Sequence, residues 1–165
     1  TGLRPALEKV LHQNQGIRVI VFGDHPHQAF QIKANGERKF FLPGIEKDQW
    51  QSVLPSIDIG LLPRSGEVDD RLGREAVLEF MAIKIPWAGS ESISLFDQRS
   101  YGWLVPNHQT SWQKVLEDLI EHVDNYRKDT NDSYLFALGQ GLEENFDRLI
   151  STCIQFHTKI WDGVK

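Results

Sequence analysis

Short, almost unbroken apolar runs that alternate with amphipathic stretches set the fold class of this chain. Residues 17–22 read Ile-Arg-Val-Ile-Val-Phe, and such a β-branched run is typical of a strand buried on both faces of a parallel sheet. Turn-forming residues close this run at Gly23 and Asp24. Similar runs predict four further strands, at residues 39–42, 57–62, 85–88 and 103–105.

Amphipathic helices are predicted around these strands, over residues 3–14, 46–54 and 73–84, where apolar residues recur at helical spacing. Two long helices are predicted to end the chain, joined by a polar, flexible connection at residues 127–131. The predicted N-caps are Thr110 or Ser111 for the first of these helices and Asp132 or Ser133 for the second. The second helix carries the apolar stripe Leu135, Leu138, Leu142, Phe146, Leu149, Ile150 and Cys153.

Strands that alternate with helices need crossover connections, which are almost always right-handed. The predicted fold is therefore α/β: one Rossmann-like, three-layer domain over residues 1–165, with a mostly parallel, doubly wound sheet. In such sheets ligands bind beyond the carboxyl ends of the strands, which selects the loops at 23–27, 42–46, 62–73 and 88–93. Six residues are predicted to pack in the core or between helices and sheet: Trp50, Phe80, Met81, Trp87, Trp103 and Trp112.

The charge balance argues against nucleic acid as the main partner. The 18 Lys and Arg residues are outnumbered by 23 Asp and Glu residues, whereas domains that bind nucleic acid are usually basic. His25 and His27 have no Cys near them in the sequence, and no metal site is predicted. Cys153 is the single cysteine and cannot form an internal disulfide. With no signal sequence and no apolar run of roughly 20 residues, the expected location is cytoplasmic.

The order of the predicted elements is unusual at the start of the chain. The chain opens on a predicted helix, whereas this architecture usually opens on a strand. The final helices are also long for so small a sheet. We therefore expect the chain to be a piece of a larger protein, without that protein's first strand.

Residues 78–90 carry the most specific pattern. They read Leu-Glu-Phe-Met-Ala-Ile-Lys-Ile-Pro-Trp-Ala-Gly-Ser. This resembles the segment LE-aromatic-MA-x-x-x-P-hydrophobic-x-x-S of glycosyltransferases with the GT-B fold, in the family of sucrose and glycogen synthases and bacterial polysaccharide transferases. Residues 40–45, 54–63 and 101–105 are similar to further strand and loop segments of that family, in the same order. The resemblance covers about residues 17–120, and the order and spacing of its motifs support it.

The resemblance implies the C-terminal, donor-binding domain of a two-domain enzyme. Such an enzyme transfers a sugar from a nucleoside diphosphate sugar, here UDP- or GDP-linked, to a glycan, glycolipid or polysaccharide acceptor. The nucleotide sugar is the substrate, and no cofactor or metal is implied. The N-terminal acceptor domain would be the partner, so the chain alone is expected to be inactive and no catalytic residue is predicted in it. Any membrane association would be peripheral, through the acceptor.

The predicted phosphate and ribose contacts lie at one helix. Its start near Gly73 would offer free N–H groups and the positive end of the helix dipole to a diphosphate. Arg71 and Arg74 stand at this start, and a guanidinium can bind phosphate oxygens through two parallel hydrogen bonds. Glu79 matches the family residue that accepts hydrogen bonds from the ribose hydroxyls. The alternative for Arg71 and Arg74 is ordinary solvated or salt-bridged charges, and for Glu79 a solvated helix residue.

Two loops complete the predicted donor site. Gly23 and Asp24 follow the first strand, and the backbone of Leu42, Pro43 and Gly44 could pair with the edge of the base. The alternative for the two glycines is a plain role in turns.

Several functional alternatives stay open. Retaining members of the family carry an E-x7-E motif, but Arg71 stands where its first Glu would fall, so the stereochemical outcome is open. A GT-B-fold epimerase would need catalytic His and Glu residues in an arrangement not found here. A receiver-like module would need an Asp after the third strand, where Pro63 stands. The main alternative is a non-catalytic, Rossmann-like interaction or scaffold module.

Overall fold

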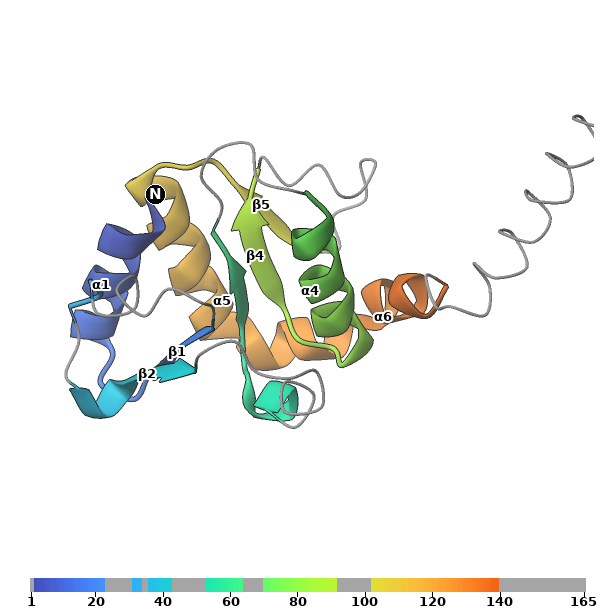
Figure 1. Cartoon of the computed structure of the whole chain (residues 1–165), viewed down its shortest axis with the longest axis horizontal. Helices are drawn as coiled ribbons and strands as arrows, with labels where there is room; N and C mark the ends of the chain where they lie inside the picture. The colour runs from blue at the N-terminus through green and yellow to red at the C-terminus, as the bar shows by residue number, and fades with distance from the viewer. Residues whose placement is uncertain are drawn as a thin grey trace, which may run out of the picture.

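A computed structural model gives the structure of residues 2–22, 31–33, 36–42, 53–63, 70–91 and 102–139; for Gly36 and residues 70–75 it describes the backbone alone. Figure 1 shows the arrangement of the elements. The helices are α1 (Leu3–Gln13), α4 (Asp70–Ala82), α5 (Gln109–Asp129) and α6 (Asn131–Leu138), with short 3-10 turns η1 (Gly36–Arg38) and η2 (Leu54–Ser56). The strands are β1 (Val19–Phe22), β2 (Lys39–Leu42), β3 (Gly60–Leu62), β4 (Trp87–Ser90) and β5 (Trp103–Val105).

The described strands form two small parallel sheets, whereas one sheet was predicted. β3, β4 and β5 are neighbours in that order, with Gly60 opposite Trp87 and Ala88 opposite Trp103. β1 pairs with β2, with Val19 opposite Lys39. In Figure 1 this pair lies at the lower left, toward the end at which β3 and β4 begin. The architecture is therefore mixed α/β with parallel sheets.

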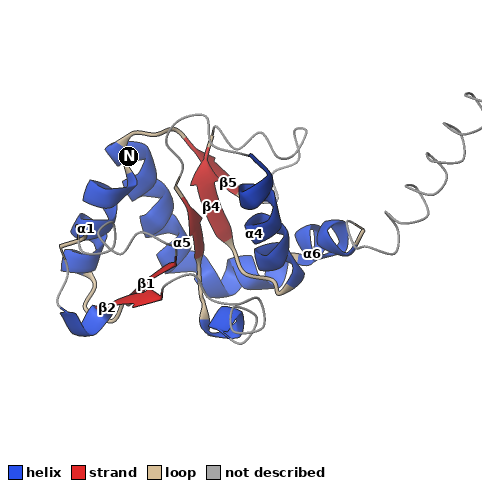
Figure 2. Ribbon diagram, viewed as in Figure 1, coloured by secondary structure: helices blue, strands red, loops and turns tan. Residues whose placement is uncertain are grey.

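Neighbouring residues of the three-stranded sheet pack into two different hydrophobic clusters, one on each face. Leu61, Ala88 and Val105 pack in a cluster with α1 and α5. Leu62, which follows Leu61, and Trp87, which precedes Ala88, pack in a second cluster with α4 and α6. Figure 2 shows the strands lying between these helices. Because side chains of a strand alternate between faces, burial on both sides explains why these strands are almost wholly apolar.

The packing confirms the predicted core residues that the structure describes; Trp50 lies outside the described residues. Phe80, Met81, Trp87 and Trp112 are buried, and Trp103 is partly buried against the cluster of α1 and α5. α1 and α5 pack their apolar stripes against each other, with these buried members: Leu3, Ala6, Leu7, Val10, Leu11, Trp112, Leu116 and Leu119.

The starts of α1 and α5 lie side by side. The backbone N–H of Gly2 donates to the side-chain oxygen of Asn107 at 2.9 Å. A Cβ at Gly2 would lie 2.4 Å from the carbonyl carbon of His108, so the close approach requires glycine. Since Asn107 follows β5 directly, α1 begins at the edge where the strands of the larger sheet end.

Arg38 joins the β1–β2 pair to the other end of α1. Its Nη1 donates to the carbonyl oxygens of Leu11 and Asn14, at 2.9 and 3.0 Å. A cation at the carboxyl end of a helix is favourable because the carbonyl groups there have no partner within the helix. This contact ties the smaller sheet to the helix layer.

Element boundaries show where the sequence signals were accurate. β2 and β5 have the predicted bounds, and β1 and β3 begin two to three residues later than predicted. α4 begins at Asp70 instead of Gly73, and a negative residue at a helix start is favourable. β4 covers Trp87–Ser90, because Ile85 instead donates its N–H to the carbonyl of Phe80 at 2.8 Å and completes the end of α4.

The connection predicted between the last helices is wrong. α5 continues to Asp129 and α6 begins at Asn131, so residues 127–131 are almost wholly helical. A single non-helical residue, His122, kinks α5 earlier in its course.

The predicted N-caps are also wrong. The capping positions are His108 and Thr130, and neither makes a side-chain cap hydrogen bond. The start of α5 lies against Gly2 instead, where a Cβ would meet the backbone of His108 and Gln109. The residues predicted as caps lie inside helices: Thr110, Ser111, Asp132 and Ser133.

The stripe predicted on the last helix is exposed where the structure describes it. Leu135 and Leu138 are 55% and 51% exposed, and α6 buries Ser133 and Ala137 instead. The remaining members of that stripe lie beyond Gly139, outside the described residues: Leu142, Phe146, Leu149, Ile150 and Cys153.

Candidate functional site

The β3–α4–β4 unit forms the candidate site. β3 and β4 are adjacent and parallel, and α4 is the helix that connects them. A crossover helix of this kind begins near the carboxyl end of the strand before it. Figure 1 shows the first turn of α4 at the top, where β4 ends. Backbone N–H groups of this first turn have no partner within the helix and can bind an anion.

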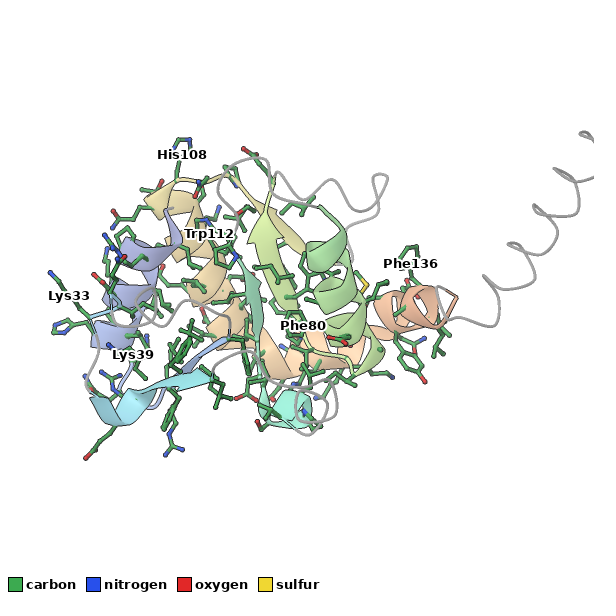
Figure 3. The ribbon with its side chains drawn as sticks, viewed as in Figure 1. Lys33, Lys39, Phe80, His108, Trp112 and Phe136 are labelled. Atoms are coloured by element: carbon green, nitrogen blue, oxygen red, sulfur yellow. The ribbon has the colours of Figure 1, made fainter. Side chains whose placement is uncertain are left out.

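The position of α4 over the sheet depends on a glycine. A Cβ at Gly60 would lie 2.6 Å from two ring carbons of Phe80, so only a residue without a side chain lets the ring rest on β3. Val77 and Met81 complete the buried face of α4. Figure 3 labels Phe80, which lies between α4 and the strands. The second half of α4 is therefore packed closely against the sheet.

The end of α4 is closed by a Schellman motif, a standard C-terminal helix cap. The N–H of Lys84 donates to the carbonyl of Met81 at 3.1 Å, and the N–H of Ile85 donates to that of Phe80 at 2.8 Å. Lys84 has a φ of 59°, a conformation that usually belongs to glycine at this position. Its Nζ lies 4.9 Å from the centre of the Tyr134 ring, which links α4 to α6.

Three predicted donor-site residues lie in the first turns of α4. Because the helix begins at Asp70, Arg71 is its second residue, and Gly73 and Arg74 follow within the first turn and just beyond it. The backbone of these residues is helical. α4 therefore begins almost one turn before the predicted start at Gly73.

Glu79 is half-buried and lies on the same helix. At 1.5 Å per residue it is about 13 Å along the axis from Asp70. The helical period of 3.6 residues per turn places Glu79 on the side of α4 away from Val77 and Met81. The start of α4 and Glu79 thus lie along one helix, with Glu79 on its outer side.

The other predicted donor-site residues are not brought to this helix by the described structure. Leu42 is the last residue of β2 and belongs to the smaller sheet. In Figure 1, β2 and the first turn of α4 lie at opposite ends of the molecule. The remaining four residues lie outside the described part of the chain: Gly23, Asp24, Pro43 and Gly44.

A second polar cluster, which the sequence analysis missed, lies on α5. Tyr126 Oη donates to Asp118 Oδ2 at 2.7 Å, and His122 Nδ1 lies 3.3 Å from Asp118 Oδ1. The Tyr126 ring packs edge-on against Trp103 at the start of β5, with centroids 4.6 Å apart. The pKa of Tyr126 is raised, first by this hydrogen bond, then by burial and by the charge of Asp118. The four-residue spacing of Asp118, His122 and Tyr126 was the available signal, because it places them on one helix face.

An ion pair fixes the end of this cluster to the sheet. Arg127 Nη2 lies 3.2 Å from Asp58 Oδ1 and donates to the carbonyl oxygen of Ile57 at 2.7 Å. Ile57 and Asp58 both precede β3. The cluster therefore lies at the edge where the strands of the larger sheet begin, opposite the edge where α4 begins. Its contacts join α5 to the strands.

Metal and membrane features were searched for over the described residues. Within these ranges no three His, Cys, Asp or Glu side chains come together in a way that could hold a metal ion. Over the same ranges, no helix combines the length and apolar character needed to cross a membrane.

Comparison with known proteins adds no assignment. No protein-family model matches the chain, and no curated protein matches it significantly.

Proposed function

We propose that this chain is the donor-binding domain of a GT-B-fold glycosyltransferase, in which a UDP- or GDP-linked sugar is held for transfer to a glycan, glycolipid or polysaccharide acceptor. A Rossmann-like arrangement of the domain is part of the same proposal. The observation that carries it is the parallel β3–α4–β4 unit, whose crossover helix begins at the carboxyl edge of the sheet and bears the segment Leu78–Ala82. This segment is also the part of the chain that carries the most specific motif resemblance.

The diphosphate is assigned to the first turn of α4. Free N–H groups and the helix dipole would bind its oxygens, and Arg71 and Arg74 would add charge-assisted hydrogen bonds. The first six residues of α4 also include Asp70 and Glu75, so the formal charges of this segment cancel. Binding then depends on the geometry of the donors, and we expect a weak affinity, with a Kd of about 0.1–1 mM.

The nucleoside is assigned to the outer side of α4, where half-buried Glu79 would accept hydrogen bonds from the ribose hydroxyls. When the glycosidic bond breaks, negative charge grows on the departing diphosphate, and donors at the helix start would stabilise it. The acceptor must be positioned by a second domain, so the chain alone should transfer sugar at a negligible rate.

Calorimetric titration with UDP and GDP tests the phosphate part of the proposal. Arg71→Ala and Arg74→Ala should each weaken binding of the preferred nucleotide by roughly tenfold, because a charge-assisted hydrogen bond is lost. Lys128→Ala is the matched control, since it removes the same charge from an exposed position on α5. No heat with either nucleotide at millimolar concentration would reject the proposal in favour of a non-catalytic interaction or scaffold module.

The ribose contact needs a separate comparison. Glu79→Gln should weaken UDP or GDP binding. It should weaken binding of the 2′-deoxy nucleotide by a smaller factor, because that nucleotide lacks one of the hydroxyls. Glu121→Gln, at an exposed position of α5, is the control. If Glu79→Gln weakens binding of the ribose and deoxyribose nucleotides by the same factor, Glu79 does not contact the 2′-hydroxyl.

A further inference from the structure

α5 changes direction at His122, and the chain before and after this bend packs on different faces of the larger sheet. Before the bend, Trp112, Leu116 and Leu119 are buried in the cluster with α1. After it, α6 continues the chain on the other face, where Ala137 is buried in the cluster with α4. Figure 1 shows α5 descending beside α1 and then running on beneath the strands toward α6. The bend therefore lies where the chain passes from one face of the sheet to the other.

Contacts after the bend hold α5 against the edge at which the strands of the larger sheet begin. The Tyr126 ring packs on Trp103, the first residue of β5, with ring centroids 4.6 Å apart. Arg127 donates to the carbonyl oxygen of Ile57, which precedes β3. From Gln109, the first residue of α5, to Tyr126 a straight helix is about 26 Å long, whereas β5 is about 10 Å long. Because α5 begins near the opposite edge, a straight helix would extend past the start of β5.

The side chain of His122 provides a cause for the bend. Its Nδ1 lies 3.1 Å from the carbonyl oxygen of Asp118 and 3.3 Å from Asp118 Oδ1. Both oxygens accept hydrogen bonds, so Nδ1 carries a hydrogen and donates it. In a regular helix that carbonyl takes the backbone N–H of the residue four positions later, which is His122 itself. A side chain that enters this ladder of hydrogen bonds bends the helix.

We propose that His122 is a positioning residue, whose imidazole bends α5 beneath the sheet and so places α6 against α4. The hydrogen bond from Tyr126 Oη to Asp118 Oδ2, 2.7 Å long, joins the two sides of the bend and supports it. α6 then packs beside the carboxyl end of α4, where Lys84 Nζ lies 4.9 Å from the centre of the Tyr134 ring. The start of α4 is the proposed anion site, and only this link to nucleotide binding rests on the proposed function.

Hydrogen exchange of the full chain tests this role. His122→Ala removes the ring and favours a regular helix, so the amides of α6 should lose protection by about tenfold or more, while those of α1 keep theirs. His122→Asn should retain the protection of α6, because its side-chain amide can donate to the same carbonyl. Glu121→Ala, at an exposed position beside His122, is the control and should leave α6 unchanged.

The coupling between Lys84 and Tyr134 gives an independent measurement. In a cycle of Lys84→Gly and Tyr134→Leu, this coupling should vanish in the His122→Ala background and persist in the His122→Asn background. Unchanged protection of α6 in His122→Ala, or equal losses in both His122 variants, would overturn the proposal. An equal loss over α1 would also overturn it, because His122 would then stabilise the whole chain. Neither measurement uses a nucleotide, so the outcome does not depend on the proposed donor site.

Discussion

At the scale of the residue, Gly60 decides how closely α4 lies on the sheet. Its missing side chain leaves room for the Phe80 ring. Gly60→Ala should lower the free energy of unfolding by about 1–3 kcal/mol, because a buried strand and a ring held by its neighbours must move apart. Denaturant unfolding measures this difference.

Gly16→Ala is the control for this substitution. Nothing lies within 4 Å of a Cβ placed at Gly16, which is exposed. Its free energy of unfolding should stay within about 0.5 kcal/mol of the parent protein. If Gly60→Ala were equally neutral, Phe80 would not rest on β3 as described.

Tyr126 contributes a hydrogen bond that depends on pH. Its donation to Asp118 raises its pKa in the folded protein above the unfolded value of about 10. A raised folded pKa means that the stabilisation is complete below the unfolded pKa and is lost as pH rises through the folded pKa. Tyr126→Phe should therefore be less stable than the parent protein at pH 7, and the difference should shrink above pH 10. Urea unfolding at both pH values measures it.

The control for this pH dependence is Tyr134→Phe, which keeps the ring beside Lys84. Its stability relative to the parent protein should vary less between neutral and alkaline pH. A Tyr126→Phe difference that is constant over this range would show that the ring packing on Trp103 dominates, and not the hydroxyl.

Sequence reasoning at this scale found the residues whose role is packing. Phe80, Met81, Trp87 and Trp112 were predicted to be buried, because large apolar side chains at regular spacing have few alternatives. Gly60 was not singled out, since a close approach between a strand and a helix leaves no local mark in the sequence. For the candidate site, the motif located Arg71, Arg74 and Glu79 on one helix, but their ligand contacts stay predictions.

At the scale of the element, the cap of α4 combines strain with a compensating contact. Lys84 adopts a left-handed conformation that costs a side-chain-bearing residue roughly 1–2 kcal/mol, and its ammonium lies over Tyr134. Lys84→Gly should remove the strain but also the cation–π contact, which is worth about 0.5–1 kcal/mol at an exposed site. We expect a small net change in the parent protein and a clearer stabilisation, of about 1 kcal/mol, when Tyr134 is already replaced by Leu.

Thermal or urea unfolding of the four proteins in this cycle separates the two effects. The coupling between the substitutions gives the contribution of the contact. If Lys84→Gly stabilises both backgrounds equally, Lys84 gains nothing from Tyr134, and α4 and α6 are held together by their apolar residues alone.

Elements were predicted well where one local signal is sufficient. β2 and β5 have the predicted bounds because turn residues or glycine flank a short apolar run. The caps of α5 and α6 were missed, because Thr110, Ser111, Asp132 and Ser133 are good capping residues that lie inside helices whose starts depend on tertiary contacts. The packing of Gly2 on His108 is one such contact, and it joins positions more than a hundred residues apart in sequence.

At the scale of the whole molecule, the alternation of strands and helices predicted the class and the layering but not the pairing of strands. An apolar strand reveals that both its faces are buried, and β3 and β4 confirm this. It does not reveal which strand lies beside it. The β1–β2 pair and the β3–β4–β5 sheet come with contacts between segments distant in sequence, such as that of Arg38 with α1, which no periodicity encodes.

The direction of α1 has a practical consequence for every binding assay. Gly2, the residue before α1, donates to Asn107, so a peptide fused ahead of Gly2 would leave the molecule at the edge where the strands of the larger sheet end. α4 begins at the same edge of the sheet, on its other face, and protonated imidazole groups of a polyhistidine label at this edge would attract phosphate. Nucleotide titrations are therefore best made after the label has been cleaved off.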